Sequence, residues 1–367
     1  ALAADHLVFQ DSIQIWVKFG SRNIFSSRNA GDLILSARIL QTYQSKQAVY
    51  SDSVLLTSSG IKWQNEKAVA QVTIPRTAVV PNGLINLVLT DRLGDQRNSI
   101  DIAFTPANLE KKYVVLEPAS GLPKFRHFLT SGESFILQTS FTSAEIAAPQ
   151  YSADFPPALP PMSLSEKKAA PTIPLIATHS LKTNTPITLT SPGLYALEPA
   201  EGSAGILLVA GNEFPELTTA KELIDPLIYI TTSKERASLY NAENPKKAVD
   251  KFWLTIGGSE QFTRTLIREY YSRVTDANKL FTSHKPGWMS DRGMIFTVMG
   301  RPSKVNRFAD REEWIYVVTD NRPTTEFTFL KRENNLTNNH YELVRDPVYE
   351  PIWFSAAEQW RKGIIDP

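Results

Sequence analysis

Alternation of apolar and polar residues dominates the first hundred positions of the chain. In the stretch SIQIWVKFG, at residues 12–20, every second side chain is apolar, namely Ile13, Ile15, Val17 and Phe19. A period of two places such side chains on one face of a strand. The alternation recurs around residues 33–39, 68–74, 85–89 and 100–104, and DRLGDQRNS before the last of these has the composition of a hairpin turn. Strands at this spacing predict an Ig-like β-sandwich domain over residues 1–108.

A second β-rich region follows over residues 109–213, with KYVVLEP, ESFILQTSF, IPLIATHSL, PITLTSPGLYALEP and GILLVAG as candidate strands. We expect a second β-sandwich there. Residues 148–174 interrupt it with seven prolines, a composition that favours an extended path and that we expect to be unsuitable for a central strand. The preferred interpretation is a long surface loop. The alternative is a partner-binding arm, in which the contact residues would be Tyr151, Phe155, Pro156, Pro157, Pro160 and Pro161.

From residue 214 the apolar period changes to that of a helix. The stretch TTAKELIDPLIYI predicts a short helix, and NPKKAVDKFWLTI predicts a longer one with Asn244 as its N-cap and Pro245 at its first position. Gly257 and Gly258 end that helix, and Ser259 can cap the next one. The apolar stripe of this next helix is Phe262, Leu266, Tyr270, Val274, Ala277 and Phe281.

Aromatic residues concentrate in the last part of the chain, where five of the seven tryptophans lie at residue 253 or beyond. The stretches GMIFTVM, EEWIYVV, TEFTFLK and HYELVRD alternate in polarity, and we expect them to form a four-stranded antiparallel meander. Two or three helices would cover one face of this sheet. The overall prediction is a mainly β protein with a C-terminal α+β unit over residues 214–367.

The charge of the chain limits the kinds of partner that we expect, and its length limits the number of domains. The 367 residues include 39 basic and 38 acidic side chains, so the formal net charge is +1. A nearly neutral chain has no strong field to attract nucleic acid or an anionic membrane surface, and we expect no nucleic-acid partner. At roughly 100–200 residues per domain, the length indicates two or three domains.

Cysteine is absent, which excludes disulfides, thiolate nucleophiles and Cys-ligated metals from this sequence. The sequence begins Ala1-Leu2-Ala3 without Met, and we expect an exported protein whose N-terminal signal or lipid anchor has been removed. The longest apolar runs, such as GILLVAG at 205–211, are far shorter than the roughly 20 residues of a bilayer-spanning helix. Membrane association would therefore come from a lost N-terminal lipid or from a partner.

No motif of a known enzyme class is present: the sequence lacks a Gly-x-Ser-x-Gly elbow, a His-Glu-x-x-His pair, a phosphate loop and a dinucleotide fingerprint. His284 lies near Ser290 and Asp291, which raises the hypothesis of a catalytic triad. A local turn is the preferred interpretation, because triad members usually come from separate elements. The remaining histidines are too far apart to align on one helix as metal ligands; they are His6, His127, His179 and His340. The sequence predicts no catalytic residue, no metal site and no cofactor.

Two alternatives remain open at this point. Acidic residues near Asp291 or Glu312 could serve an envelope-polymer hydrolase. The aromatic residues of 312–331 could stack on sugar rings in a glycan-binding module, although their alternation favours a sheet face under helices.

The stretch Gly287-Trp288-Met289-Ser290-Asp291 resembles the signature of the GWxTD-domain family, which occurs in predicted envelope proteins of Bacteroidota and related phyla. Ser290 stands where the signature has Thr and keeps its hydroxyl. The resemblance extends over about residues 214–350, through AVDKFW, REYYSRVTDANKLF, Arg292-Gly293, Gly300-Arg301-Pro302 and EEWIYV. We interpret the signature as a structural joint: Gly287 would adopt a conformation closed to other residues, Gly293 would start a strand close to another backbone, and Pro302 would end that strand.

This resemblance implies an exported protein, often a lipoprotein, and no known reaction. The resulting hypothesis is a non-catalytic scaffold or accessory subunit of an outer-membrane protein or lipoprotein complex. Secretion, surface assembly and nutrient uptake are the processes considered. Its expected location is the cell envelope, at the periplasmic or surface face of the outer membrane.

Overall fold

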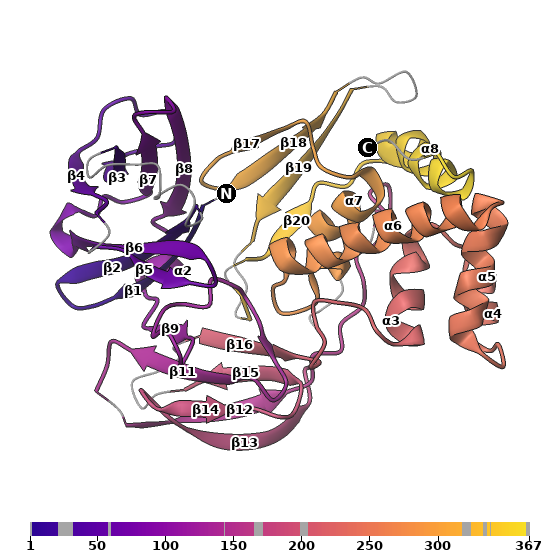
Figure 1. The fold of residues 1–367 in the computed structure, drawn as a ribbon, viewed down its shortest axis with the longest axis horizontal. Coiled ribbons are helices and arrows are strands. Elements are labelled where there is room, and N and C mark those ends of the chain that lie inside the picture. The colour runs from indigo at the N-terminus through magenta and orange to yellow at the C-terminus, as the bar shows by residue number, and fades with distance from the viewer. Residues whose placement is uncertain are drawn as a thin grey trace. The chain divides into compact units, whose positions relative to one another are not determined.

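The computed structural model describes residues 2–20, 32–57, 60–142, 144–164, 172–198, 205–317, 324–332, 336–337 and 339–364. They form two compact units, one of residues 1–151 with 175–209 and one of residues 152–174 with 210–367. The first unit consists mainly of strands, and the second combines helices with one sheet (Figure 1). The predicted class, mainly β with helices gathered toward the C-terminus, is confirmed.

Eight strands form the first sandwich, as two antiparallel sheets with the orders β1-β2-β6-β5 and β4-β3-β7-β8. Fully buried side chains such as Ile15 and Leu35 fill the space between these sheets, as the period of two predicts. The predicted hairpin pairs Asp91 with Gln96. The strands are β1 (Ala3–Val8), β2 (Ser12–Phe19), β3 (Leu33–Leu40), β4 (Tyr50–Leu55), β5 (Lys62–Gln64), β6 (Lys67–Pro75), β7 (Leu84–Asp91) and β8 (Gln96–Ala103), with short helical turns at η1 (Arg76–Ala78) and α2 (Pro106–Leu109).

The second sandwich has a five-stranded sheet, β10-β16-β15-β12-β13, and a three-stranded sheet, β14-β11-β9. Phe135 and Tyr195 are fully buried in its core. A separate apolar cluster joins the two sandwiches, and it includes Leu7 and Trp16 of the first and Leu116 of the second. The strands are β9 (Tyr113–Leu116), β10 (Leu129–Thr130), β11 (Ser134–Thr139), β12 (Glu145–Tyr151), β13 (Leu175–Lys182), β14 (Pro186–Thr188), β15 (Gly193–Leu197) and β16 (Gly205–Ala210).

One expectation about the proline-rich residues is wrong. Pro149 lies in β12, which is a central strand between β15 and β13. The ladder between β12 and β15 covers only Gln150 and Tyr151, so Pro149 lies outside the paired stretch on that side. A missing backbone amide is tolerated where the ladder has a gap. Further along the segment, the described residues 152–164 and 172–174 belong to the second unit.

Helices make up most of the second unit, and their ends follow the capping signals. The Asn244 side chain accepts a hydrogen bond from the Lys247 amide at 3.0 Å, and Gly258 ends the same helix with φ +69°. The predicted stripe of the next helix is buried except for Phe262, which is 40% exposed. These helices are α3 (Ala220–Ile224), the 3-10 turn η2 (Asp225–Tyr229), α4 (Ser233–Tyr240), α5 (Pro245–Gly257) and α6 (Glu260–Phe281). Helix α4 was not predicted from the sequence.

The segment GMIFTVM, predicted as the first strand of the meander, lies instead in helix α7 (Asp291–Met299). All residues from Arg292 to Met299 are buried, so an apolar period of 3.6 is not visible in them. The signals of a helix were at its ends, where Ser290 is the N-cap and Gly300 follows the last turn. Figure 1 shows α7 next to α6 on one side and β20 on the other.

The sheet of the second unit is still a four-stranded antiparallel meander, with Lys304–Arg307 as its first strand. Its order is β17 (Lys304–Arg307), β18 (Arg311–Tyr316), β19 (Thr325–Lys331) and β20 (Tyr341–Leu343). The turn η4 (Pro347–Tyr349) and helix α8 (Glu350–Arg361), which was not predicted, complete the unit. Within the described part of the chain, none of the helices is long and apolar enough to cross a bilayer.

Candidate functional site

Residues 282–290 connect α6 to α7 and include the predicted signature up to Ser290, while its last residue, Asp291, begins α7. Thr282 donates its hydroxyl to the Asn278 carbonyl at 2.6 Å and accepts the Gly287 amide at 3.0 Å. The Asn278 side chain accepts the Trp288 amide at 3.3 Å. Thr282 and Asn278 are both fully buried. The end of α6 therefore satisfies the backbone amides of the connection, as buried polar groups require.

Two glycines allow the backbones to pack against each other. A Cβ on Gly287 would lie 1.9 Å from the Ala277 carbonyl oxygen in α6, and a Cβ on Gly293 would lie 1.8 Å from the Gly287 carbonyl oxygen. No side chain fits at such distances. The expected reason for Gly287, a special backbone conformation, is wrong, because the structure requires it for close approach.

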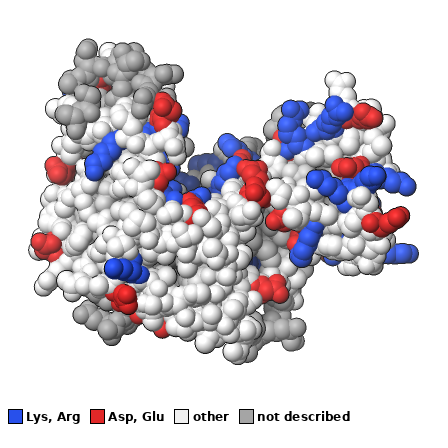
Figure 2. All heavy atoms as spheres, turned by 60° about the horizontal axis from the view of Figure 1, so that its bottom comes forward, with Lys and Arg blue, Asp and Glu red and all other residues white. Residues whose placement is uncertain are grey.

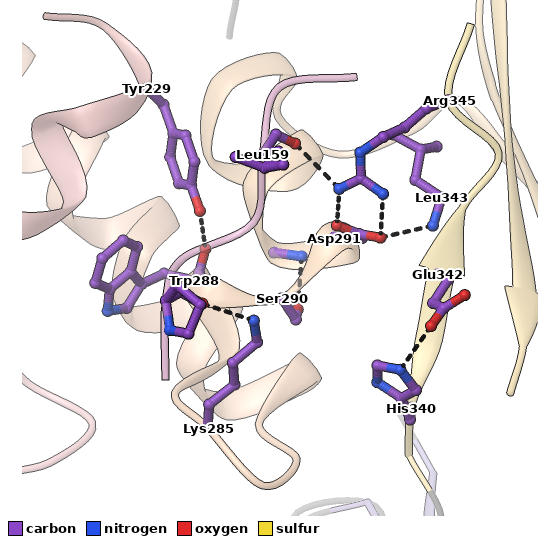
Figure 3. Close-up of polar contacts among 12 residues, drawn as sticks. Leu159, Tyr229, Lys285, Trp288, Ser290, Asp291, His340, Glu342, Leu343 and Arg345 are labelled. Carbon is purple, nitrogen blue, oxygen red and sulfur yellow. Dashed lines mark hydrogen bonds and ion pairs between the residues drawn. The ribbon is translucent and has the colours of Figure 1, made fainter. Parts of the chain in front are cut away.

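The Trp288 ring packs inside the unit and is 7% exposed. Its carbonyl accepts a hydrogen bond from the Tyr229 hydroxyl at 3.0 Å, and the two rings meet edge to face with centroids 6.0 Å apart (Figure 3). Burial raises the pKa of Tyr229 well above its usual value. The hydroxyl is therefore a hydrogen-bond donor and not an acid.

Ser290 and Asp291 fix the start of α7 (Figure 3). The Ser290 hydroxyl donates to the Gly287 carbonyl at 2.7 Å and accepts the Gly293 amide at 3.0 Å. Asp291 accepts the Leu343 amide of β20 at 2.7 Å and two hydrogen bonds from Arg345, at 2.6 and 3.1 Å. Both oxygens of this carboxylate are thus used to join helix α7 to the sheet.

Arg292, the next residue of α7, is buried against the same sheet. Its guanidinium carbon lies 3.9 Å from the centroid of the Tyr341 ring, and Nη1 lies 3.5 Å from Glu312 Oε2. Nη2 donates to the carbonyl of Asn339 at 3.3 Å. Burial lowers the pKa of Arg292, and the negative charge of Glu312 opposes that shift.

The end of α7 depends on Gly300, which has φ +81° and ψ −159°. Its carbonyl accepts the Tyr316 hydroxyl at 2.9 Å, and a Cβ there would lie 2.9 Å from Arg273 Nη1. Pro302 follows in the turn to β17. The expectation that Pro302 ends a strand is therefore wrong, because the element before it is a helix.

Residues 154–162 of the proline-rich segment pack against this connection. Phe155 meets the His284 ring edge-on with centroids 4.7 Å apart, and Ala158 belongs to the apolar core of the unit. Pro156, Pro157 and Trp288 line an open pocket whose other lining residues are Asp154, Phe155, Lys221, Asp225, Ile228, Arg236, Tyr240 and Met289. Tyr151, in contrast, is the last residue of β12 in the first unit.

The environment of His284 and Lys285 shifts both side chains toward their neutral forms. Burial, together with the charges of Lys285 and His340, lowers the pKa of His284 to about 4. Nδ1 of His284 has no hydrogen-bond partner among the described residues. Burial also lowers the pKa of Lys285 to about 8, against the opposing charge of Asp291.

The local geometry does not favour the triad of His284, Ser290 and Asp291. The Ser290 proton points to a backbone carbonyl, and Asp291 is paired with Arg345. The His284 ring instead contacts aromatic neighbours. The three side chains therefore serve packing, capping and ion pairing.

The other residues considered for chemistry are dispersed. Glu312 accepts the Trp314 indole N–H at 3.1 Å in addition to its pairing with Arg292. In the first unit, His6 and His179 bond to Asn108 and Gln150 respectively. Among the described residues, no group of three His, Cys, Asp or Glu side chains is arranged to hold a metal ion.

Sequence reasoning missed the partners of the signature, chiefly Arg345, Tyr229 and Asn278. They lie 54, 59 and 10 positions away from the signature residues that they contact. Their types are ordinary for a strand end and for helical segments. Because pairing across such distances depends on the tertiary fold, no local signal could have identified them.

Residues 193–362 match the family model of the GWxTD domain. The chain therefore carries a GWxTD domain over these residues. A search of curated proteins found no match.

The GWxTD match starts at Gly193, so it includes β15 and β16 of the second sandwich as well as almost all of the helical unit. The signature residues of the GWxTD domain are thus a helix-to-helix connection with its capping and ion-pair partners. Residues 154–162, which pack on that connection, lie outside the matched range.

Proposed function

We propose that this GWxTD-domain protein is a non-catalytic scaffold or accessory subunit of an outer-membrane protein complex in the cell envelope. The observation that carries the proposal is the use of the signature's polar groups. Ser290, Asp291 and Arg292 are each bonded within the fold, to backbone, to Arg345 and to Glu312. A group held in this way stabilises the domain and is not poised to act on a substrate.

The first unit offers a surface suited to a protein partner. β13 is the last strand of its sheet, and Leu175 and Ile176 at its start are each 58% exposed. An edge strand with exposed apolar side chains can pair with a strand of another chain. On the face that Figure 2 shows, the described Lys and Arg side chains of the helices are interspersed with Asp and Glu. Shape and apolar contact, more than net charge, would therefore select the partner.

The alternatives receive no specific support. The carboxylates considered for a hydrolase, Asp291 and Glu312, are each paired with an arginine, and each carboxylate side chain is only 11% exposed. The aromatic residues considered for glycan stacking include Trp314 and Phe329, which are 3% and 0% exposed. Every described aromatic side chain of the first unit is buried or half-buried.

The test is isolation of the tagged full-length chain from its own membranes in mild detergent, followed by mass spectrometry. We expect stoichiometric recovery of an outer-membrane protein. The variant Ile176→Lys should reduce that recovery, whereas Leu93→Lys, at a 61% exposed position in the turn between β7 and β8, should not. Recovery of the chain only as a free monomer would contradict the proposal.

A further inference from the structure

Residues 154–162 are bound to the GWxTD domain mainly through their backbone. The Lys285 ammonium donates to the Pro156 carbonyl at 2.9 Å, and Arg345 donates to the Leu159 carbonyl at 3.1 Å. Two backbone hydrogen bonds add to these, from Ala158 N to Met289 O at 2.9 Å and from Asp346 N to Pro161 O at 3.2 Å. A receptor that bonds to carbonyls and amides recognises an extended chain, and it places few demands on the side chains of that chain.

Apolar contacts accompany these hydrogen bonds at two points. The Phe155 ring lies against the His284 ring, and the Ala158 side chain is 9% exposed within the core of the unit. Met162 packs on the same core. The ligand therefore needs an aromatic residue and then a small residue three positions later.

Proline suits this mode of binding. Residues 152–160 contain neither helix nor strand, and prolines stand at 156, 157, 160 and 161. Proline restricts the unbound chain to extended conformations, so less conformational entropy is lost on binding. The carbonyls that meet Lys285 and Arg345 belong to residues three positions apart, which is one turn of a polyproline II helix.

We propose that the surface formed by His284, Lys285, Met289 and Arg345 is a receptor for extended, proline-containing peptide segments, and that residues 154–162 are its resident occupant. A partner protein would present a segment of the same chemistry and displace the resident one. This inference rests on the proposed function for the existence of such a partner. The receptor lies within the family-matched range and its occupant lies outside that range, so the two are separate parts of the chain.

Tethering explains how a weak ligand can remain bound and still exchange. The segment lies between β12 and β13, whose ends pair at Tyr151 and Leu175. A short tether gives an effective concentration on the order of 1 mM. With an intrinsic dissociation constant of about 100 μM, the resident segment would occupy the receptor about nine-tenths of the time.

The direct experiment uses the full-length chain with residues 152–174 replaced by a short Gly-Ser turn, which the pairing of Tyr151 with Leu175 permits. A fluorescent peptide of residues 152–164 is titrated and its polarisation is measured. We expect saturable binding in the micromolar range, and about tenfold weaker binding to the unmodified chain because its own segment competes. The peptide with Phe155→Ala, and the same peptide with its sequence reversed, should bind several-fold more weakly.

Matched lysine variants identify the site. In the modified chain, Lys285→Met should weaken peptide binding at least threefold, whereas Lys279→Met, which removes a half-exposed lysine of α6, should leave it unchanged. Absence of saturable binding to a folded modified chain would overturn the inference. So would equal effects of the two lysine substitutions.

A second measurement on the unmodified chain covers the case in which the replacement prevents folding. The Ala158 amide should exchange its hydrogen at least tenfold faster than the Phe296 amide inside α7, because the resident segment detaches without global unfolding. Equal exchange rates would show that the segment is a permanent part of the core and would refute the receptor. Because both measurements use purified protein, a failed membrane isolation would count against the proposed function alone.

Discussion

Asp291 offers a direct test of the structural role of the signature. The substitution Asp291→Asn removes the negative charge opposite Arg345 and keeps an oxygen that can accept the Leu343 amide. The side chains of the pair are 11% and 19% exposed, so water would compensate little for the lost charge. The prediction is a loss of stability of the second unit.

The magnitude follows from the burial of this pair. Removing one partner of a buried ion pair costs about 3–5 kcal/mol, because the other charge is left uncompensated. Asn keeps one acceptor, and Arg345 keeps its bond to the Leu159 carbonyl, so the lower end applies. We expect a decrease of about 3 kcal/mol in the free energy of unfolding of the second unit.

Urea unfolding followed by tryptophan fluorescence measures this change. Five of the seven tryptophans lie at residue 253 or beyond, so the signal reports mainly on the second unit. With a urea dependence of about 2–3 kcal/mol per M, the midpoint should fall by about 1 M or more. The control Glu358→Gln breaks an exposed ion pair with Lys362, and it should change stability by at most about 0.5 kcal/mol.

A midpoint that moves no more in Asp291→Asn than in Glu358→Gln would refute this reasoning. It would mean that the ion pair does not hold α7 to β20, and that the carboxylate is available for another role. A double substitution with Arg345→Met would then be uninformative, because no coupling would remain to be measured.

Three further predictions concern the same unit. Gly287→Ala should lower the free energy of unfolding by about 3 kcal/mol or more, because its Cβ would lie 1.9 Å from the Ala277 carbonyl, whereas Gly211→Ala, with no atom within 4 Å of the added Cβ, should be nearly neutral in the same urea assay. Tyr229→Phe removes a buried hydrogen bond to the Trp288 carbonyl and should cost about 1–2 kcal/mol, also measured by urea unfolding. The pKa of His284 falls from 6.5 to about 4 on folding, so the unfolded chain binds a proton first as the pH drops, and stability should fall by about 2 kcal/mol between pH 7 and pH 5. His284→Gln should lose less stability over the same pH interval when urea midpoints are compared.

Each of these three has an outcome that contradicts it. Equal urea midpoints for Gly287→Ala and Gly211→Ala would exclude the close backbone approach. An unchanged midpoint in Tyr229→Phe would mean that water satisfies the Trp288 carbonyl. If the wild-type chain and His284→Gln lose the same free energy of unfolding between pH 7 and pH 5, then His284 is not buried in its neutral form.

Local signals were sufficient where a segment has a clear apolar period or its own capping residue. The alternation around Ile15 and the caps at Asn244 and Ser259 predicted strand β2 and helices α5 and α6, because each signal is complete within a few neighbouring residues. The signature was also recognisable from its amino-acid sequence alone, and the family match includes it.

The same reasoning was wrong for α7, because that helix is buried all round and its apolar residues show no preferred face. The same reasoning also placed Phe262 in the core, although its side chain is partly exposed in the structure. In both cases the decisive information was what surrounds the segment, and this is absent from the segment itself.

The sequence alone determined the strands and helices with a clear apolar period and the identity of the signature. Only the tertiary structure decided what the signature contacts: Arg345, Tyr229 and Asn278 come from other elements, and residues 154–162 come from outside the matched range. The physical reason is that capping and periodicity depend on neighbours within one or two turns, whereas ion pairs and backbone packing depend on which distant segments meet.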